Sequence, residues 1–525
     1  MKAGENAAGG GRHPWTHPHV LRIVDLADPD ALNPVIGNQQ IDVDLSMFWA
    51  GYLFDWNDRN EFVPELATEV PALANHGISR DGRTFTYHLR RGVRWHDGAP
   101  FGADDVIFTY HAVMNPRNNV GSRTGYDLID QIGKRDDATL VIHLRRAWSP
   151  FVASFFTMSG TPYPILPAHL LAKFPDINNV AYNQKPVGTG PFKVDSWQHG
   201  TLIRFVANPD YWRGRPKLDE IDFRPIPDQN TILTQLRTHE ADLDWNGSSA
   251  QVDEFKKIDG DVVDLVPFNA YSQLAFNLSN PILADVAVRR ALALATDRRT
   301  IIDKVTHGAE LLGEGDLPPY VGWTAPVAAP AYDPAAARRA LDAAGWHSGA
   351  DGVRVKGGRR LSLVVTPTTG SATGNATAVL LQRWWRDVGV EVSVKGYPAA
   401  LMFASYGAGG IMQRGKFDVG FLSWYAGVDP DNSTQFMCDQ QPPGGQNIYR
   451  FCDAEFDATE RAALATYDPA ARKRDYQRIE QILVDRRPFL TMYFVRRVIP
   501  HNADLRGFPP AHAVTALWNP WEIDI

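Results

Sequence analysis

Few residues of this chain have the spacing that known catalytic motifs require. A serine hydrolase with a nucleophile elbow needs Gly-x-Ser-x-Gly, which the sequence lacks. A zinc peptidase needs His-Glu-x-x-His, but residues 238–241 (THEA) are not followed by the second histidine. Residues 410–417 (GIMQRGKF) approach a phosphate-binding loop, yet Phe417 stands where a magnesium-binding Ser or Thr is needed. The motifs therefore favour neither hydrolysis nor nucleotide binding.

Three histidines near the start and two cysteines near the end are the other candidates for chemistry. His13, His17 and His19 lie in a flexible stretch, where we expect adventitious metal binding and no built site, and we predict no cofactor. Cys438 and Cys452 flank the turn sequence QPPGG. We predict a disulfide between them, which closes a loop of about 15 residues, contributes about 3 kcal/mol and is typical of an oxidising compartment. The alternative, two buried free thiols, is typical of the cytosol.

The length and composition limit the class of protein. A chain of 525 residues exceeds what one hydrophobic core organises, so we expect two or three structural units. With 44% hydrophobic and 22% charged residues the chain is typical of soluble globular proteins, and its apolar runs fall far short of the roughly 18 residues that a membrane span needs. The net charge is −7 and the basic residues are scattered, so we predict no nucleic-acid partner.

The elements that must position any site are of mixed type. Alternating patterns predict strands mainly in the first half, at residues 20–27, 84–89, 139–146, 190–197, 202–209 and 220–227. A helix is predicted at 103–114, with Asp104 and Asp105 in its first turn. From about residue 283 the predicted helices lengthen: they fall within 285–308, 333–346, 375–389 and 469–487, and strands follow Gly389 and Pro488. We therefore predict an α/β lobe in the second half.

Five segments resemble, in the right order, one family of proteins. Residues 81–98 (DGRTFTYHLRRGVRWHDG) predict a short β-rich module between two Asp-Gly turns and open the first segment. The segments are 81–116, 187–197 (VGTGPFKVDSW), 208–228, 276–308 and 416–432 (KFDVGFLSWYAGVDPDN). They resemble the extracytoplasmic solute-binding proteins of ABC importers, in the large oligopeptide, dipeptide and nickel-binding class known as family five. The resemblance runs from about residue 20 to the C-terminus.

The resemblance implies an α/β, two-lobed periplasmic-binding-protein-like fold (type II) with an additional inserted α+β domain in the first lobe. It implies five parts of the chain: residues 1–45 as a flexible tail and the start of lobe I, 46–186 as the inserted domain, 187–272 as lobe I, 273–487 as lobe II, and 488–525 as the return to lobe I. A ligand would be enclosed when a hinge between the lobes closes.

The resemblance also implies ligand-binding residues on both lobes. In the first lobe these are Asn38, Gln39 and Gln40, for which the alternative is a plain helix-capping loop. In the second lobe the strongest candidates are Trp424 and Tyr425. Further candidates, for which core or hinge packing is the alternative, are Tyr271, Tyr320 and Tyr397.

One departure from the family pattern concerns the ligand's amino group. In peptide-binding members an aspartate soon after the tryptophan pairs with the α-ammonium of the peptide, which is a charge-assisted contact. Here Gly427 stands three residues past Trp424, and the nearest carboxylates are Asp429 and Asp431. Either Asp429 takes this role, in a loop that is one residue shorter, or the ammonium site is absent.

By resemblance we expect a non-enzymatic receptor of an ABC importer that binds a peptide in the interlobe cleft, delivers it to the permease, and works as a monomer outside the cytoplasm. The Gly/Ala-rich start resembles the tether of a bacterial lipoprotein, so we expect a removed export signal and a possible lipid anchor; a disordered cytoplasmic tail is the alternative. Three other functions stay open: a receptor for an oligosaccharide or other solute, a secreted hydrolase without a recognisable motif, and a receptor that signals to a membrane sensor.

Overall fold

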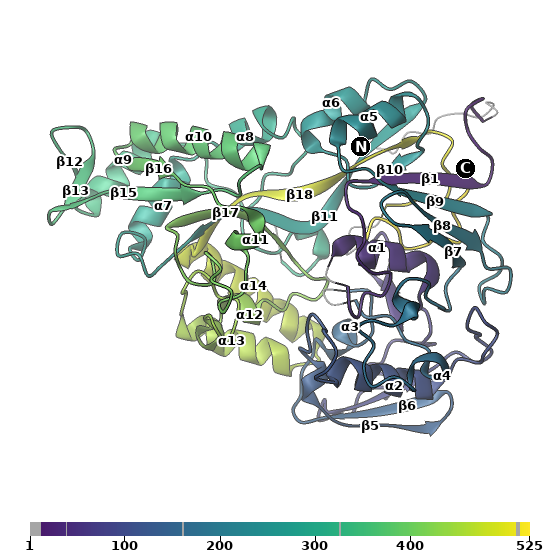
Figure 1. Ribbon diagram of the computed structural model, residues 1–525. Coiled ribbons are helices and arrows are strands. Elements are labelled where there is room, and N and C mark those ends of the chain that lie inside the picture. Colours follow the sequence, from purple (N-terminus) through teal and green to yellow (C-terminus); the bar gives the residue numbers. More distant parts are fainter. Residues whose placement is uncertain (1–11, 38, 160–161, 325–326, 511–514) are drawn as a thin grey trace.

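One ten-stranded sheet runs through the molecule (Figure 1). The computed structural model describes residues 12–37, 39–159, 162–324, 327–510 and 515–525. The strands, in spatial order, are β16 (Glu391–Val394), β15 (Ser362–Thr366), β17 (Val419–Tyr425), β11 (Asp261–Phe276), β18 (Phe489–Asn502), β10 (Leu243–Asp244), β1 (Val20–Asp25), β9 (Glu220–Pro225), β8 (Leu202–Ala207) and β7 (Phe192–Gln198).

Two long central strands join the two halves of this sheet. β11 and β18 pair antiparallel, and in Figure 1 they extend from one half of the molecule into the other. On one side β17 pairs with β11, and on the other side β10 pairs with β18. We call the half with β1 and β7–β10 the first lobe, and the half with β15–β17 the second lobe. Each lobe is therefore built from segments far apart in the sequence.

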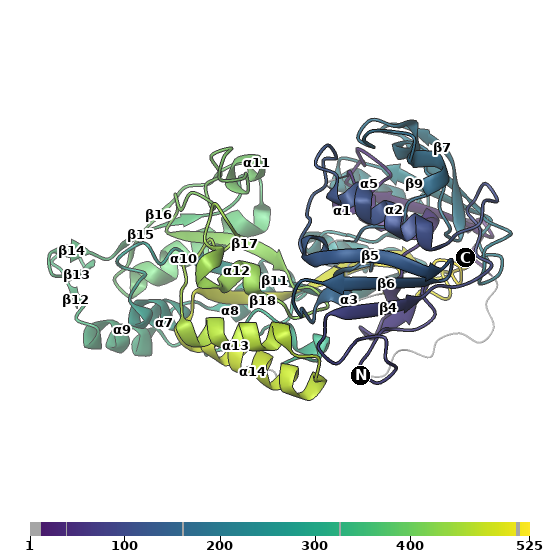
Figure 2. The same ribbon diagram turned by 90° about the horizontal axis from the view of Figure 1, so that it is seen from below.

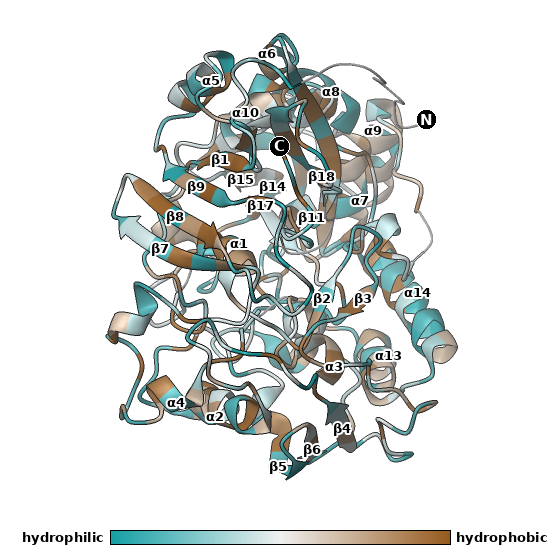
Figure 3. Ribbon diagram, turned by 90° about the vertical axis from the view of Figure 1, so that its right-hand side faces the viewer, coloured by the Kyte–Doolittle hydropathy of each residue, from teal (hydrophilic) through white to brown (hydrophobic). Residues whose placement is uncertain are grey.

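The smaller sheets of the expected inserted domain lie in the lower part of the molecule as Figure 1 and Figure 3 show it. A three-stranded sheet has the order β4 (Thr84–His88), β6 (Thr139–Leu144), β5 (Ile129–Asp136), and a hairpin joins β2 (Phe54–Trp56) to β3 (Phe62–Pro64). Within β4, Phe85 and Tyr87 are fully buried, as the alternating pattern predicts. The second lobe adds β12 (His347–Ser348), β13 (Arg354–Lys356) and β14 (Arg359–Arg360).

Helices cover both faces of the large sheet. Those of the first lobe are α1 (Gln40–Trp49), α2 (Ala103–Met114), α3 (Phe151–Ser154), α4 (Ala168–Leu171), α5 (Gln229–Arg237) and α6 (Val252–Phe255). Those of the second lobe are α7 (Val286–Leu294), α8 (Arg298–Lys304), α9 (Pro334–Ala343), α10 (Ala372–Asp387), α11 (Ala399–Met402), α12 (Ser433–Phe436), α13 (Ala454–Ala465) and α14 (Pro469–Arg486). The helix predicted at 103–114 is confirmed as α2, and the helices predicted within 333–346, 375–389 and 469–487 correspond to α9, α10 and α14. The segment 285–308 is divided into two shorter helices, α7 and α8.

Most of the buried side chains form cores that lie within one lobe or the other. The largest core joins residues of β1, β7–β9 and α1 to residues of β4, β6 and α3. The inserted region thus packs against the first lobe through one continuous apolar layer. In the second lobe, one core lies under α7, α9 and α10 and another under α13 and α14. The two-lobed α/β architecture agrees with the expectation, while the five numbered boundaries stay a prediction.

The inserted region also contacts the second lobe directly, near α13 and α14 (Figure 2). The hydroxyl of Tyr467 donates to the carbonyl of Gly82 at 2.9 Å and accepts from the backbone N–H of Trp148 at 3.1 Å. The N–H of Ser149 donates to the carbonyl of Leu464 at 2.8 Å. The Asp81-Gly82 turn before β4 therefore forms part of the contact between the inserted region and the second lobe.

Candidate ligand-binding site

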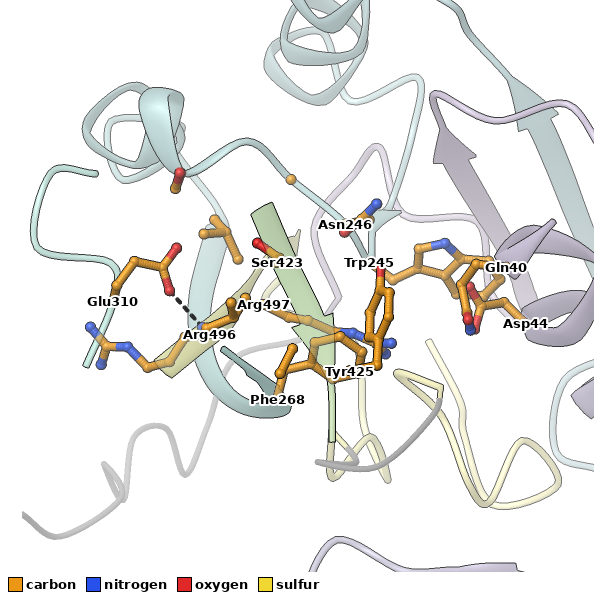
Figure 4. A pocket seen from close by; sticks show the side chains of 15 residues that line it. Gln40, Asp44, Trp245, Asn246, Phe268, Glu310, Ser423, Tyr425, Arg496 and Arg497 are labelled. Atoms are coloured by element: carbon orange, nitrogen blue, oxygen red, sulfur yellow. Dashed lines mark hydrogen bonds between the residues drawn. The ribbon is translucent and has the colours of Figure 1, made fainter. Parts of the chain in front are cut away.

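A pocket of about 310 Å³ lies where the first lobe, the central strands and the second lobe meet (Figure 4). The first lobe contributes Gln40, Asp44 and residues 245–249, except Ser248. The central strands contribute Phe268, Ala270 and residues 495–498, and the second lobe contributes Glu310, Ser423 and Tyr425. Because residues from both lobes line it, the pocket would change shape with any movement between them.

Helix α1 and the end of β10 form the first-lobe wall. Gln40 begins α1, and its side-chain amide donates to Oδ1 of Asp44 one turn later, at 3.0 Å. Trp245 follows β10 and is 3% exposed. Its indole N–H donates to the buried Asp25 at 2.8 Å, and its ring stacks near Phe48 and Phe223. Packing and this hydrogen bond hold the indole in one orientation.

An irregularity in the central strands forms the floor of the pocket. The pairing of β11 with β18 is interrupted between Pro267 and Tyr271, and the pocket residues Phe268 and Ala270 lie in this interval. The guanidinium of Arg497 lies over the ring of Phe268, 3.9 Å from its centroid. The hydroxyl of Tyr320 donates to the carbonyl of Phe268 from behind. Such an irregularity bends the strand and increases its twist locally.

The second-lobe wall is the end of β17. Ser423 and Tyr425 line the pocket, and Tyr425 is 64% exposed. The rings of Tyr425 and Phe268 pack edge to face, with their centroids 5.6 Å apart. Figure 4 shows Tyr425 and Phe268 on one side and Trp245, Gln40 and Asp44 on the other. The hydroxyl of Ser423 is hydrogen-bonded to that of Ser272 at 2.6 Å. The pocket thus has aromatic walls from both lobes.

Carboxyl groups in and behind the pocket have raised pKa values. Burial raises the pKa of Asp44 to about 7, although Arg497 and the Gln40 amide lower it. Burial also raises the pKa of Glu310 to about 7, opposed by the Arg496 N–H that donates to it at 2.7 Å. Behind the first-lobe wall, burial raises the pKa of Asp25, and that of Asp244 to about 8. Burial therefore disfavours the charged form of these carboxyl groups, and a nearby cation would favour it.

Of the residues predicted from the sequence, Gln40 and Tyr425 line this pocket. Gln39 is exposed at the start of α1, where its N–H donates to Asp42 at 3.0 Å, and Asn38 lies outside the described residues. Trp424 is half-buried and packs against the second-lobe core, because successive side chains of a strand point to opposite faces. Gly427 follows in the loop after β17.

The three tyrosine candidates lie outside the lining of the pocket. Tyr271 is 1% exposed, and its hydroxyl donates to Gln435 within the second-lobe core. The hydroxyl of Tyr320 donates to the carbonyl of Phe268, and Tyr320 is not among the residues that line the pocket. Tyr397 lines a different hollow of the second lobe, with the Lys395 ammonium 5.2 Å from its ring. The expectation of a cleft position does not fit Tyr271, whose place on the opposite face of β11 directs it into the core.

Asp429 already has a cationic partner within the protein. Its two carboxylate oxygens accept from the guanidinium of Arg472 at 2.7 and 2.6 Å, and both side chains are largely buried. The ring of Trp323 lies under the same guanidinium, and its N–H donates to the carbonyl of Val428. Asp429 therefore fastens the loop after β17 to α14. It is not among the residues that line the pocket, where we expected a partner for the ligand's ammonium group.

Several pocket residues carry no recognisable signal in the sequence. Asp44 reads as one of several polar residues of a helix, and Trp245 as a core residue after a short strand. Arg497 lies in a strand that is apolar on both sides, so an unexpected charge there was the only available sign. These residues meet only because β18 returns to the centre of the sheet.

Other predictions about chemistry can be compared with the described residues. The disulfide Cys438–Cys452 is confirmed, with Cα atoms 4.5 Å apart. Within residues 12–525, gaps in the description aside, no three His, Cys, Asp or Glu residues gather as a metal site would require. Across the same part of the chain, no helix combines the length and the apolar character that crossing a membrane demands.

Comparison with known proteins agrees with the two-lobed fold. Residues 61–445 match the family described as "Bacterial extracellular solute-binding proteins, family 5 Middle". Protein XP55 of Streptomyces lividans is 30% identical over 463 residues, which cover 87% of this chain and 80% of that protein. The dipeptide-binding protein of Escherichia coli is 27% identical over 499 residues, covering 88% of this chain and 89% of that protein.

A solved structure extends this comparison to the fold. NikZ from Campylobacter jejuni, in complex with Ni(L-His), superposes with a TM-score of 0.79 at 24% identity, covering 97% of this chain and 99% of that one. The fold is thus that of a type II periplasmic binding protein, two lobes around a ligand site. The family match places the chain among the bacterial extracellular solute-binding proteins of family 5, and it belongs to that family.

Proposed function

We propose that the protein is the receptor of an ABC importer, that it binds a peptide in the pocket between its lobes, and that it delivers this peptide to the permease. It performs no catalysis and needs no cofactor, and it acts as a monomer outside the cytoplasm. The dipeptide-binding relative in E. coli supports a peptide as cargo, while NikZ makes a nickel complex the rival.

The observation that carries the peptide proposal is the backbone edge of β17. Its pairing with β11 continues to Tyr425, but its parallel pairing with β15 ends at Gly420. Among the described residues no strand pairs with the second edge of 421–425. An extended peptide can add its backbone to such an edge, and side-chain pockets then distinguish its residues. Ser423 and Tyr425, which line the pocket, belong to this segment.

An oligosaccharide is the second candidate, because exposed aromatic faces stack on sugar rings. Tyr425 is 64% exposed and offers such a face, whereas Trp245 lines the pocket from the first lobe but is only 3% exposed. A sugar, however, offers no backbone to pair with the free edge of β17, so the peptide accounts for more of the site.

A thermal-shift screen separates these cargoes. A defined pool of di- to pentapeptides is expected to raise the melting temperature, by an amount that grows with ligand concentration, and to be recovered unhydrolysed. Oligosaccharides and nickel–histidine are tested in parallel, and native mass spectrometry identifies anything that co-purifies. Binding of sugars or nickel complexes without peptides would replace the proposal, and steady product release would indicate a hydrolase.

A further inference from the structure

The peptide proposal raises the question of which group meets the ligand's amino terminus. At neutral pH a peptide carries an ammonium group there, and burying a charge without a partner is costly. Asp429 is engaged by both nitrogens of the Arg472 guanidinium at 2.7 and 2.6 Å and does not line the pocket. An ammonium bound by Asp429 would have to compete with that ion pair. The partner is therefore sought among the residues that line the pocket.

Two carboxyl groups line the pocket, and they differ in how far they are engaged. Glu310 is 8% exposed and accepts the backbone N–H of Arg496 at 2.7 Å, while the Arg496 guanidinium donates to the carbonyls of Ala309 and Gly308. Asp44 is half-buried and accepts only the Gln40 amide, at 3.0 Å, among the described residues. Each of the two carboxylates thus accepts one hydrogen bond in the part of the chain that the structure describes, but Asp44 is the more exposed, and its donor is a side chain instead of the backbone of a strand. Asp44 is therefore the carboxylate that a ligand reaches more easily.

The surroundings of Asp44 suit a cation. The indole of Trp245 stands beside α1, held by Asp25, and the ring of Tyr425 faces it from the second lobe (Figure 4). Aromatic faces attract an ammonium group, and the attraction grows when water is excluded. The charged groups that act on Asp44 are Arg497 from β18 and Asp25 from β1. Arg497 is stacked on Phe268.

We propose that Asp44 is the carboxylate that binds the primary ammonium group of the ligand, with Trp245 and Tyr425 as aromatic walls, so that ligands with a free amine are selected. This assignment rests on the proposed peptide-receptor function and adds to it the residue that determines specificity. The amino group is thereby held by the first lobe, and the peptide backbone by β17 of the second, so that one ligand bridges both lobes.

The test uses the full chain and three versions of one defined tri- to pentapeptide pool: with free amines, N-acetylated, and with the amine replaced by hydrogen. Acetylation adds bulk whereas the hydrogen replacement removes it, so a loss with both reports the charge. The wild-type protein is expected to bind the free-amine pool at least tenfold more tightly than either copy, by calorimetry. Asp44→Asn is expected to remove this difference and to lower affinity for the free-amine pool about tenfold.

Asp429→Asn is the matched control, measured below its melting temperature, and it is expected to keep the amine preference. The assignment is overturned if Asp44→Asn retains the preference, if Asp429→Asn loses it, or if wild-type protein binds all three pools equally. If none of the three pools binds to wild-type protein, the peptide-receptor function fails and this assignment fails with it. Circular dichroism of both variants verifies that they are folded.

Discussion

At the scale of single residues, the half-buried Asp44 carboxylate makes the stability of the protein depend on pH. Burial raises its pKa from 3.8 to about 7, so between these pH values the folded chain binds this proton more tightly than the unfolded chain. The contribution of Asp44 to stability therefore falls as the pH rises through this window. Arg497 and Gln40 oppose the shift, and Asp25 adds to it.

The expected result for unliganded Asp44→Asn is a melting temperature about 1–3 °C above wild type at pH 8 and little changed at pH 4, close to the unfolded pKa of 3.8. Differential scanning calorimetry of both proteins at the two pH values measures this. Glu310 and Asp244 titrate in both proteins, so the comparison cancels them. A variant that melts below wild type at pH 8 would show that the Asp44 carboxylate is stabilised by groups of the protein itself.

Asp429 behaves in the opposite way, because its charge is paired. Asp429→Asn leaves the largely buried Arg472 guanidinium without its counter-ion, and we expect a loss of about 3 kcal/mol in unfolding free energy. Urea denaturation measures the loss. Asp351→Asn is the control, since its ion pair with Arg360 is exposed and its loss should change the stability very little. Equal effects of the two substitutions would contradict the structural role of Asp429.

At the scale of elements, the disulfide fixes the segment between α12 and α13. Within the loop that it closes, the Asn447 side chain donates to the carbonyls of Phe436, Met437 and Phe451. Replacing both cysteines by serine is expected to reduce stability by about 3 kcal/mol, and a reductant should do the same to wild-type protein. Denaturant unfolding with and without reductant tests this. A reductant effect of the same size on the double-serine variant would show that the bond is not its cause.

The elements themselves were largely predictable, and their meeting points were not. α2 begins at Ala103, as expected from the acidic first turn, where Asp105 accepts the N–H of Gly102. The change from α10 to β16 passes through Gly389, whose positive φ of 90° explains why glycine stands there. Alternation within β17 could not reveal which face looks toward the ligand, so Trp424 and Tyr425 were predicted together although only Tyr425 lines the pocket. Asp44 and Arg497 meet through contacts between distant segments, for which local patterns give no signal.

At the scale of the whole molecule, the contact between Gly82 and Tyr467 reports how closely the lobes approach. A Cβ at position 82 would stand 2.3 Å from Cε2 of Tyr467, so Gly82→Ala should hinder closure. We expect about tenfold weaker binding of the peptide pool and a larger radius of gyration with ligand, by calorimetry and small-angle X-ray scattering. Gly92→Ala is the matched control, because Gly92 also has a positive φ, 80°, but nothing within 4 Å of a built Cβ. If both variants bind the peptide pool equally weakly, backbone strain accounts for the loss of affinity, and hindered closure does not.

The central pair of β11 and β18 has a further consequence for how the chain is made. β18 spans Phe489–Asn502, and it supplies the neighbour of both β11 and β10. During synthesis neither half can complete its sheet until these late residues have left the ribosome, so early segments must wait with apolar edges unprotected. A nascent chain that stops before Phe489 would therefore leave both β11 and β10 with an unpaired edge.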